Sequence, residues 1–469
     1  RCFFFFFKQK TAYEIRGRIP DEINEGLAYS IGQAYAALIK PRRVVVGRDI
    51  RLTSDSLAQS LILGLRASGV SVSDIGRCGT EGVYHATFAG DESGAFDGGI
   101  MVTASHNPPD YNGMKFVREG ARPISADTGL REMAAMIAKG NLPAPVSEGS
   151  LGHGGLSALD VRDRYVDHVL SYVNRSQLRR LRVVVNPGNG GAGEFLELLE
   201  PHLPFELIKV HYEADGHFPN GVPNPMLAEN RLPTVEAIRS SGADLGLAWD
   251  GDFDRCFFFD NTGRFIEGYY LVGLLAESFL FRERGARIVH DPRLTWNTLD
   301  IVQRAGGVPV VSKSGHAFIK QKMREVDGIY GGEMSAHHYF RDFSYCDSGM
   351  IPWLLVLERI CVSGRSLAEL VDERIARFPC SGEINCRIPD AAGAIEAVRQ
   401  QHHGEALSLD YIDGLSMEFS TWRLNLRSSN TEPLLRLNVE TRGDKDLLTE
   451  KTEDTLAFLR NLGAQISDH

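Results

Sequence analysis

The fold is decided first by residues 43–49, which read Arg43-Val44-Val45-Val46-Gly47-Arg48-Asp49. The run of valines favours a buried strand, because β-branched side chains pack well on a pleated surface. A polar turn follows, then a helical pattern over residues 57–67 with Ser54 as its expected N-cap, and a second apolar stretch at residues 70–72. Strand, helix and strand in this order predict parallel pairing inside an α/β sheet.

The same plan occurs twice more along the chain. Residues 181–186 form a β-branched run before a glycine-rich turn and a helical stretch at 195–199. Residues 287–293 lead into a helical stretch at 296–305 and an apolar run at 308–311. This recurrence predicts three related α/β domains with mixed, mostly parallel sheets, and it places ligands at the turns that follow the first strands.

The C-terminal part of the sequence has a different pattern. Residues 422–427 and 434–440 alternate polar and apolar side chains, as in strands with one covered face, and a charged helical stretch spans 444–460. This pattern predicts a C-terminal α+β domain. From clusters of Pro, Gly and polar residues we expect domains at residues 1–147, 148–260, 261–377 and 378–469.

Composition narrows the class of protein. Of the 469 residues, 43% are hydrophobic and 24% are charged, which suits a globular protein with a sizeable core. The net charge of −10 and the scattered basic residues argue against nucleic acid or an anionic membrane as the main partner. The seven cysteines contain no Cys-x-x-Cys pair and fit a reduced cytoplasmic protein, and no apolar run has transmembrane length.

The first residues form an unusual tract. Phe3 to Phe7 are consecutive phenylalanines with no amphipathic period, and they are too few to span a bilayer as an anchor. Residues 8–15 read like a translated sequencing adapter. We therefore expect residues 1–15 not to belong to the native protein.

A reactive hydroxyl follows another expected strand. The apolar residues 97–102 lead into Thr103-Ala104-Ser105-His106-Asn107-Pro108. Ser105 at a strand end, with the imidazole of His106 beside it and Lys115 nearby, can carry a phosphoryl group that surrounding donors and a metal ion would stabilise. Alone, the hexapeptide is as well explained by a turn ahead of a helix that starts at Pro108.

Three carboxylates follow a further expected strand at residues 245–249. They are Asp250, Asp252 and Asp254, in a loop that contains glycine and ends with Arg255. Carboxylates two residues apart repel one another, and a hard cation such as Mg²⁺ cancels the repulsion while leaving room for a phosphate oxygen. A solvated acidic loop is the alternative, and the spacing excludes an EF-hand. Arg255 can donate to a phosphate or hold a carboxylate.

Two further loops carry polar clusters. Glu333, Ser335 and His337 follow two glycines and can bracket sugar hydroxyls, although an ordinary polar loop explains them too. Residues 427–433 combine a guanidinium, hydroxyls and an amide, the donors that a phosphate dianion needs, and a plain hairpin turn is the alternative. Each motif is weak alone, and the four motifs together in this order are specific.

On these four motifs the chain resembles the α-D-phosphohexomutase superfamily, and within it the bacterial phosphomannomutase/phosphoglucomutase group, from Ile15 to the C-terminus. Residues 103–108 are similar to the phosphoserine loop, 250–255 to the metal loop, 332–337 to the sugar-binding loop and 427–431 to the phosphate-binding loop. The resemblance implies four domains around one deep central cleft, each contributing a loop.

The resemblance also implies the chemistry. Ser105 is carried as a phosphoserine, and Mg²⁺ is bound by Asp250, Asp252, Asp254 and a phosphate oxygen on Ser105. The phosphoryl group moves between C1 and C6 of mannose or glucose phosphate through a hexose 1,6-bisphosphate that turns over in the cleft. The catalytic residues so implied are Ser105, His106, Lys115, Arg16 and Arg255, and the substrate-binding residues are His316, Glu333, Ser335, His337, Arg427, Ser429, Asn430 and Thr431.

The resemblance extends to substrate and partners. The tetrapeptide Glu333-Met334-Ser335-Ala336 is similar to that of the dual-specificity mannose/glucose group, whereas a phosphoglucosamine mutase usually has Gln in place of Met334. Arg293 and Ala336 stand where relatives often have Lys and Gly, which bears on selectivity or loop motion. We expect a monomeric, cytoplasmic isomerase that binds hexose phosphates and neither nucleic acid nor membrane. Phosphoglucosamine mutase, phosphopentose mutase and a non-catalytic sugar-phosphate-binding regulator of the same fold are the alternatives.

Overall fold

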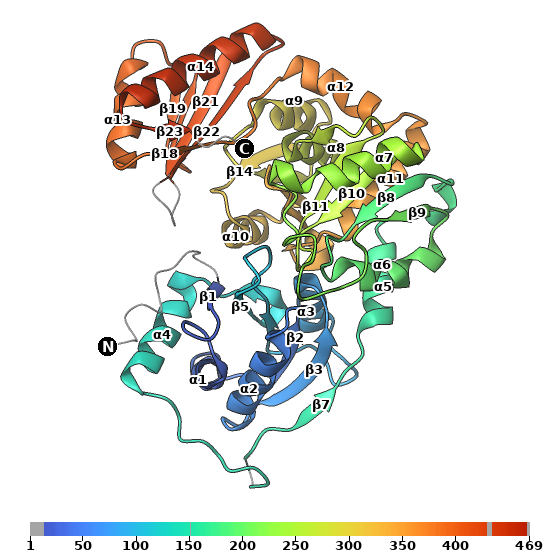
Figure 1. The fold of residues 1–469 in the computed structure, drawn as a ribbon, viewed down its shortest axis with the longest axis vertical. Helices are drawn as coiled ribbons and strands as arrows, with labels where there is room; N and C mark the ends of the chain where they lie inside the picture. Colours follow the sequence, from blue (N-terminus) through green and yellow to red (C-terminus); the bar gives the residue numbers. More distant parts are fainter. Residues whose placement is uncertain (1–13, 151, 429–433, 467–469) are drawn as a thin grey trace.

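The computed structural model describes residues 14–150, 152–428 and 434–466, and these residues form four sheets (Figure 1). The first sheet has the strand order β1-β5-β4-β2-β3-β7, with β6 beside β5. Its unit consists of β1 (Glu14–Arg18), α1 (Glu25–Ile39), β2 (Arg43–Arg48), α2 (Ser54–Arg66), β3 (Ser71–Arg77), α3 (Thr80–Ala89), β4 (Gly98–Val102), β5 (Tyr111–Arg118), β6 (Arg122–Pro123), α4 (Leu130–Lys139) and β7 (Leu156–Ala158).

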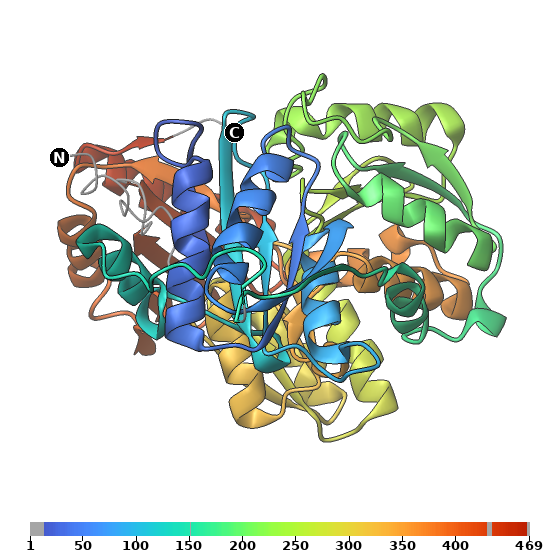
Figure 2. The same cartoon turned by 90° about the horizontal axis from the view of Figure 1, so that it is seen from below.

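The valines of β2 explain the layers of this first unit. Val44 and Val46 are fully buried against α1 and α2 on one face, and Val45 is buried against α3 on the other. This alternation is the period of two that a strand imposes. Figure 2 shows α1 and α2 side by side on their face of the sheet. The carboxyl ends of β2 and β4, which pair in parallel, therefore meet at one edge.

The second and third sheets repeat a common plan of parallel strands on one side and antiparallel strands on the other. The prediction of mixed sheets is confirmed, because the parallel pairs β8–β10 and β13–β15 adjoin the antiparallel hairpins β10–β11 and β15–β16. The second sheet comprises β8 (Arg182–Asn186), β9 (Glu206–Lys209), β10 (Leu245–Trp249), β11 (Cys256–Asp260) and β12 (Phe265–Ile266), and the third comprises β13 (Arg287–His290), β14 (Val308–Val311), β15 (Tyr330–Gly332), β16 (His338–Phe340) and β17 (Cys346–Asp347).

One continuous hydrophobic core joins the second and third units. Trp249 of β10, Tyr330 of β15 and Trp353 belong to this core and are completely buried. The two units therefore form one packed body. Their helices are α5 (Arg162–Leu170), α6 (Ala192–Leu199), α7 (Leu232–Ser241), α8 (Gly268–Arg282), α9 (Trp296–Arg304), α10 (His316–Val326), α11 (Ile351–Ser363) and α12 (Leu367–Arg377).

The C-terminal unit has an antiparallel sheet and a separate core. The alternating residues of β21 and β22 place leucines inward, as the sequence pattern predicts. In Figure 1 this unit lies at the opposite end of the molecule from α2 and β7. Its elements are β18 (Ile384–Arg387), α13 (Ala391–Gln401), β19 (Ser408–Asp410), β20 (Leu415–Glu418), β21 (Trp422–Ser428), β22 (Leu434–Thr441), α14 (Lys445–Asn461) and β23 (Gln465–Ile466).

The structure differs from two local predictions and from the alternative reading of the serine motif. The predicted N-cap Ser54 is the first residue of α2 after Thr53, and its hydroxyl instead donates to Asp49. No helix starts at Pro108, since the chain turns directly into β5. Sheets cross two of the expected boundaries, because β7 joins the first sheet after residue 147 and β12 joins the second after residue 260.

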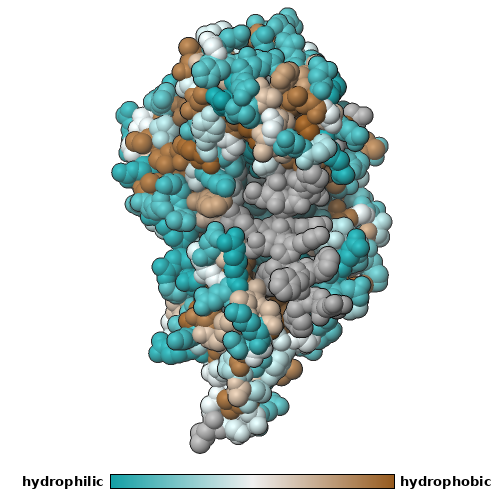
Figure 3. Space-filling model, turned by 90° about the vertical axis from the view of Figure 1, so that its left-hand side faces the viewer, coloured by the Kyte–Doolittle hydropathy of each residue, from teal (hydrophilic) through white to brown (hydrophobic). Residues whose placement is uncertain are grey.

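The hydropathy of the surface and of the helices can be compared with what a membrane-spanning protein needs. The described side chains on the face in Figure 3 are mainly hydrophilic, with hydrophobic ones in scattered groups. Among the residues that the structure describes, no helix has both the length and the apolar character needed to cross a bilayer.

Candidate active site

Ser105 lies in the loop between β4 and β5 and is only 3% exposed. Its Oγ donates to Asp250 Oδ2 at 2.9 Å and lies 3.0 Å from His106 Nδ1. The approach of the two loops requires glycine at position 251, where a Cβ atom would lie 2.4 Å from the carbonyl oxygen of Ser105. The structure thus brings the first two predicted motifs into direct contact.

The three predicted metal ligands follow β10 and are buried together. One carboxylate oxygen each from Asp250, Asp252 and Asp254 lies within 4.8 Å of the others. Lys115 reaches them from β5, with its Nζ 2.7 Å from Asp252 Oδ2 and 2.6 Å from Asp254 Oδ2. Burial opposes the charge of Lys115, but the two carboxylates outweigh burial and raise the pKa of this lysine. Lys115 therefore remains charged.

These residues fit a hard divalent cation. The Oδ1 atom of Asp252 is buried without a hydrogen-bond partner, while Oδ2 of the same carboxylate is taken by Lys115 and Thr80. Burial raises the pKa of Asp250, so this carboxylate gains from added positive charge. An all-oxygen set with an unused oxygen matches the preference of Mg²⁺.

Arg255 connects the acidic loop to the serine loop. Its Nε donates to Asp250 Oδ2 at 2.9 Å, and its Nη2 lies 2.6 Å from His106 Nδ1. Because a guanidinium only donates, His106 must accept through Nδ1, and burial together with Arg255 lowers the pKa of His106 well below its usual value. Arg16, predicted to act nearby, donates to the side chain of Asn107 and pairs with Glu14 at 2.7 Å.

The third predicted loop follows β15 and reaches the acidic loop. His337 Nε2 lies 3.8 Å from Asp254 Oδ1, and the rings of His337 and His316 stack with centroids 6.5 Å apart. Burial lowers the pKa of His316 to about 3 and that of His337 well below its usual value, so both imidazoles are neutral. Ser335 Oγ lies 3.3 Å from His337 Nδ1.

Glu333 is fixed inside the same loop. Its Oε1 accepts from the backbone N–H of Gly315 at 2.7 Å, and its Oε2 accepts from the hydroxyl of Tyr339. Arg293 Nη2 lies 3.5 Å from Oε1. Burial raises the pKa of Glu333 despite the nearby Arg293. The carboxylate is therefore held in place before any sugar arrives.

The fourth motif joins the others through a carboxylate that the sequence analysis missed. Arg427, at the end of β21, donates to Glu383 Oε2 at 2.8 Å. Glu383 also lies 3.4 Å from Arg293 and 3.2 Å from Arg436. Arg293 in turn contacts Glu333, so the C-terminal unit is linked to the sugar-binding motif. The other predicted phosphate ligands, Ser429, Asn430 and Thr431, lie outside the described residues.

Two further residues support the site without having been predicted. The hydroxyl of Thr80, the first residue of α3, donates to Asp252. Arg51 donates to the backbone of the serine loop. Asp49 and Arg51 follow a strand, as the predicted motifs do, so the sequence could have indicated that they lie near the site. The spacing of the sequence did not indicate Thr80 or Glu383.

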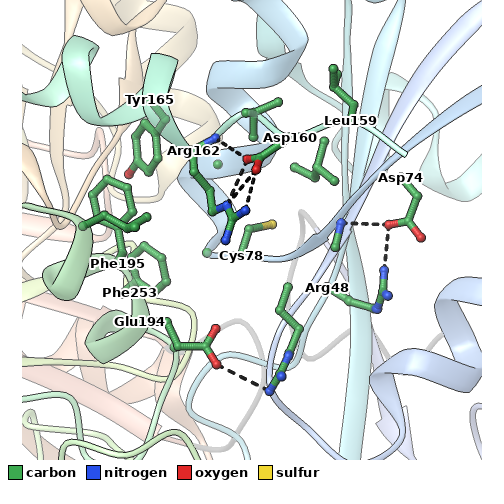
Figure 4. A pocket seen from close by; sticks show the side chains of 18 of the residues that line it. Arg48, Asp74, Cys78, Leu159, Asp160, Arg162, Tyr165, Glu194, Phe195 and Phe253 are labelled. Carbon is green, nitrogen blue, oxygen red and sulfur yellow. Dashed lines mark hydrogen bonds and ion pairs between the residues drawn. The ribbon is translucent and has the colours of Figure 1, made fainter. Parts of the chain in front are cut away.

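A cavity of about 750 Å³ lies on the other side of the acidic loop (Figure 4). Phe253, between two of the predicted metal ligands, forms part of its wall and stacks on Phe195 with centroids 6.3 Å apart. The arginines around it are paired with carboxylates, as in Arg162–Asp160. None of the predicted site residues that the structure describes lines this cavity.

Models of known families match the chain in four successive parts. They are the α/β/α domains I, II and III of phosphoglucomutase/phosphomannomutase, at residues 8–142, 163–263 and 267–378, and the C-terminal domain, at residues 383–457. The chain belongs to the phosphoglucomutase/phosphomannomutase family. The first match begins at residue 8, inside the segment 1–15, whose non-native origin stays a prediction.

Individual members of this family are similar over nearly their whole length. The phosphohexose mutases protein of Xanthomonas campestris is 59% identical over 96% of this chain and 98% of its own. The phosphomannomutase of Escherichia coli K12 is 55% identical over the same shares. A crystal structure of a phosphoglucomutase/phosphomannomutase family protein from Burkholderia thailandensis superposes with a TM-score of 0.88, at 31% identity, over 98% of this chain and 99% of the other.

Proposed function

We propose that Ser105, the acidic loop and the loops that meet them form the active site of a mutase in which Ser105 carries the transferred phosphoryl group. The chain is a hexose phosphate mutase, as its family and its phosphomannomutase relatives establish. The observation that carries the assignment of the site is the 2.9 Å hydrogen bond from Ser105 Oγ to Asp250 Oδ2. Through this bond the hydroxyl of Ser105 contacts a buried cluster of carboxylates.

The chain's own charges are arranged for phosphoryl transfer. When the phosphoserine transfers its phosphoryl group to a sugar hydroxyl, the bond between Ser105 Oγ and phosphorus breaks. A new bond forms between phosphorus and the sugar oxygen. The phosphoryl oxygens carry negative charge throughout, and Lys115 and Arg255 supply fixed positive charge beside them. A Mg²⁺ ion held by Asp250, Asp252 and Asp254 would add to this neutralisation.

The attacking hydroxyl also loses a proton. His316 and His337 are kept neutral by burial, and His337 lies within 3.8 Å of Asp254 at the reacting edge. A neutral imidazole has a free lone pair, whereas the charged Lys115 has none. The negative charge of a bound bisphosphate would raise the low pKa of these imidazoles and so make them stronger proton acceptors. We therefore assign proton transfer to this pair of histidines.

The remaining residues suit recognition of a hexose phosphate. Glu333 and Ser335 offer an acceptor and a hydroxyl for sugar hydroxyls, and Arg427 offers a guanidinium for the phosphate that is not being transferred. A mutase must bind its 1,6-bisphosphate in two orientations, so the distal phosphate is fixed more firmly than either face of the sugar.

A coupled assay tests this function and its nearest alternative. Glucose 1-phosphate, mannose 1-phosphate and glucosamine 1-phosphate are supplied side by side with Mg²⁺ and a hexose 1,6-bisphosphate. We expect turnover of the first two sugars at comparable rates, and loss of both in Ser105→Ala. Preferential turnover of the amino sugar would assign the chain to the phosphoglucosamine alternative, and no turnover of any sugar would favour a non-catalytic regulator.

A further inference from the structure

Arg51 lies beneath the serine loop and is 4% exposed. Its guanidinium donates to four backbone carbonyl oxygens of that loop. The Nη2 atom reaches Ser105 at 2.9 Å and Asn107 at 2.5 Å, while Nη1 reaches Pro108 at 2.8 Å and Tyr111 at 2.9 Å. A single side chain therefore ties together both ends of the segment 105–111.

The guanidinium is itself held from two directions. Asp49 Oδ2 lies 3.5 Å from its Nε, and Asp49 Oδ1 accepts the backbone N–H of Arg51 at 3.0 Å. The ring of Phe218, from the second unit, lies with its centroid 5.3 Å from the guanidinium carbon. A carboxylate at the edge and an aromatic ring at the face fix the plane of the guanidinium.

This arrangement acts on a strained residue. Ser105 has a backbone φ of +49°, in the left-handed region that residues other than glycine avoid. Such a conformation persists only where neighbouring groups hold it, and here the carbonyl of Ser105 accepts from Arg51 while its N–H donates to Thr103 Oγ1 at 2.9 Å. With the backbone held in this way, Oγ stays directed at Asp250.

We propose that Arg51 is a positioning residue for phosphoryl transfer, which fixes the backbone of residues 105–111 so that Ser105 faces the acidic loop. The proposal rests on the role assigned to Ser105 above. Arg51 acts through the loop backbone, since its guanidinium contacts carbonyl oxygens of that segment, with Asp49 and Phe218 holding it in place. Its effect therefore falls on the rate of transfer and spares the binding of sugar.

The substitution Arg51→Lys separates this role from charge alone. An ammonium keeps the positive charge beside Asp49 but is a point donor, and it cannot reproduce a planar fork that serves four carbonyls. We expect kcat to fall by about 10- to 100-fold, while KM for glucose 1-phosphate changes by less than about threefold. Arg48→Lys is the matched control, because Arg48 makes ion pairs with Asp55 and Asp74 and no described contact with the serine loop.

The experiment measures kcat and KM of the full chain with glucose 1-phosphate, together with Mg²⁺ affinity by calorimetry and the thermal midpoint. The proposal predicts a loss confined to kcat in Arg51→Lys, with Mg²⁺ affinity and the Arg48→Lys control unchanged. A kcat within threefold of the wild type, or a loss carried by KM, would overturn it.

A second variant covers the case in which Arg51→Lys does not fold. Asp49→Asn keeps the shape of the carboxylate but removes the charge that orients the guanidinium. We expect kcat to fall by about three- to tenfold at unchanged KM, and an unchanged kcat would contradict the proposal. Failure of the proposed function is distinguishable, because the wild-type enzyme would then show no phosphate on Ser105 at all.

Discussion

The ammonium of Lys115 lies 2.6 Å from Asp254 Oδ2, and this contact joins the first sheet to the acidic loop of the second. Both groups are buried, so each would be costly without the other. Burial opposes ionisation of Asp254, but Lys115 and Arg255 outweigh it and lower the pKa of this carboxylate. The lysine thus contributes both to domain association and to the charge of the site.

Replacing Lys115 with Met should reveal both contributions. We expect at least a hundredfold loss of kcat and a loss of about 3 kcal/mol or more in the free energy of unfolding, because two buried carboxylates lose their partner. Saturating Mg²⁺ should restore part of the stability, since the cation supplies the missing charge. Urea unfolding with and without Mg²⁺ measures this, and an equal loss in both conditions would argue against a cation at the acidic loop.

The acidic loop should lose metal affinity in proportion to its charge. Each of Asp250→Asn, Asp252→Asn and Asp254→Asn is expected to weaken Mg²⁺ binding and to reduce turnover, because an amide is a neutral ligand. Chelation should abolish the activity of the wild type, and added Mg²⁺ should restore it. Calorimetry and the coupled assay check this, with the exposed Asp163→Asn as control; full activity in chelator-treated enzyme would refute the role of a metal.

The lowered pKa of Glu383 should make the free energy of unfolding depend on pH. Burial opposes its ionisation, but Arg427, Arg293 and Arg436 outweigh burial and lower its pKa to about 2. An unfolded glutamate has a pKa of about 4.3, so the stabilisation is fully present above that pH and is lost as pH falls toward 2. The shift corresponds to roughly 3 kcal/mol.

The variant Glu383→Gln should therefore be less stable than the wild type at pH 7, and the difference should shrink below pH 4. Glu396 provides a matched control, because its pKa is also lowered to about 2 while its side chain is exposed on α13. Glu396→Gln should change stability little, since surface ion pairs are screened. Urea unfolding at pH 7, 4 and 3 tests this, and a pH-independent effect of Glu383→Gln would be inconsistent with an ionised Glu383.

Arg427 and Glu333 should affect different parameters. Arg427→Ala is expected to weaken the binding of glucose phosphate and of mannose phosphate to a similar extent. The loss of binding free energy is on the order of 2–3 kcal/mol for a charge-assisted contact. Glu333→Gln should reduce turnover and shift the ratio of glucose to mannose activity. Steady-state kinetics with both sugars test this, and Arg460→Ala is the control, because Arg460 is an exposed residue of α14 in the same domain that pairs with Glu453. A strong change of ratio in Arg427→Ala alone would exchange the two roles.

Individual strands and the motifs that follow them were predictable, because short runs of sequence determine them. The valines of β2 and the apolar run 245–249 indicated buried strands, and the polar groups that follow such strands lie at the same edges. Short hairpins such as β15–β16 were not anticipated, because an apolar run does not reveal the direction of its neighbour. Local chemistry also misled at Ser54, whose hydroxyl serves Asp49 and leaves the helix uncapped.

The support of the site was less predictable, since it depends on tertiary arrangement. Arg51 reaches the serine loop because β2 and β4 are neighbours in the sheet. In the sequence, Arg51 and Ser105 are 54 residues apart. Glu383 forms ion pairs with Arg293 of the third unit and Arg427 of the fourth. The spacing of these residues in the sequence does not indicate that they meet. Sequence patterns identify groups that do chemistry, and the groups that orient them become visible once the sheets are assembled.

The central claim is that Ser105 carries the phosphoryl group, and label transfer tests it most directly. The enzyme is incubated with Mg²⁺ and glucose 1,6-bisphosphate labelled with ³²P, and phosphopeptides are mapped before and after a chase with unlabelled glucose 6-phosphate. The account predicts label on the peptide that contains Ser105, its loss to sugar during the chase, and no label in Ser105→Ala. Label on another residue, together with wild-type turnover in Ser105→Ala, would contradict it.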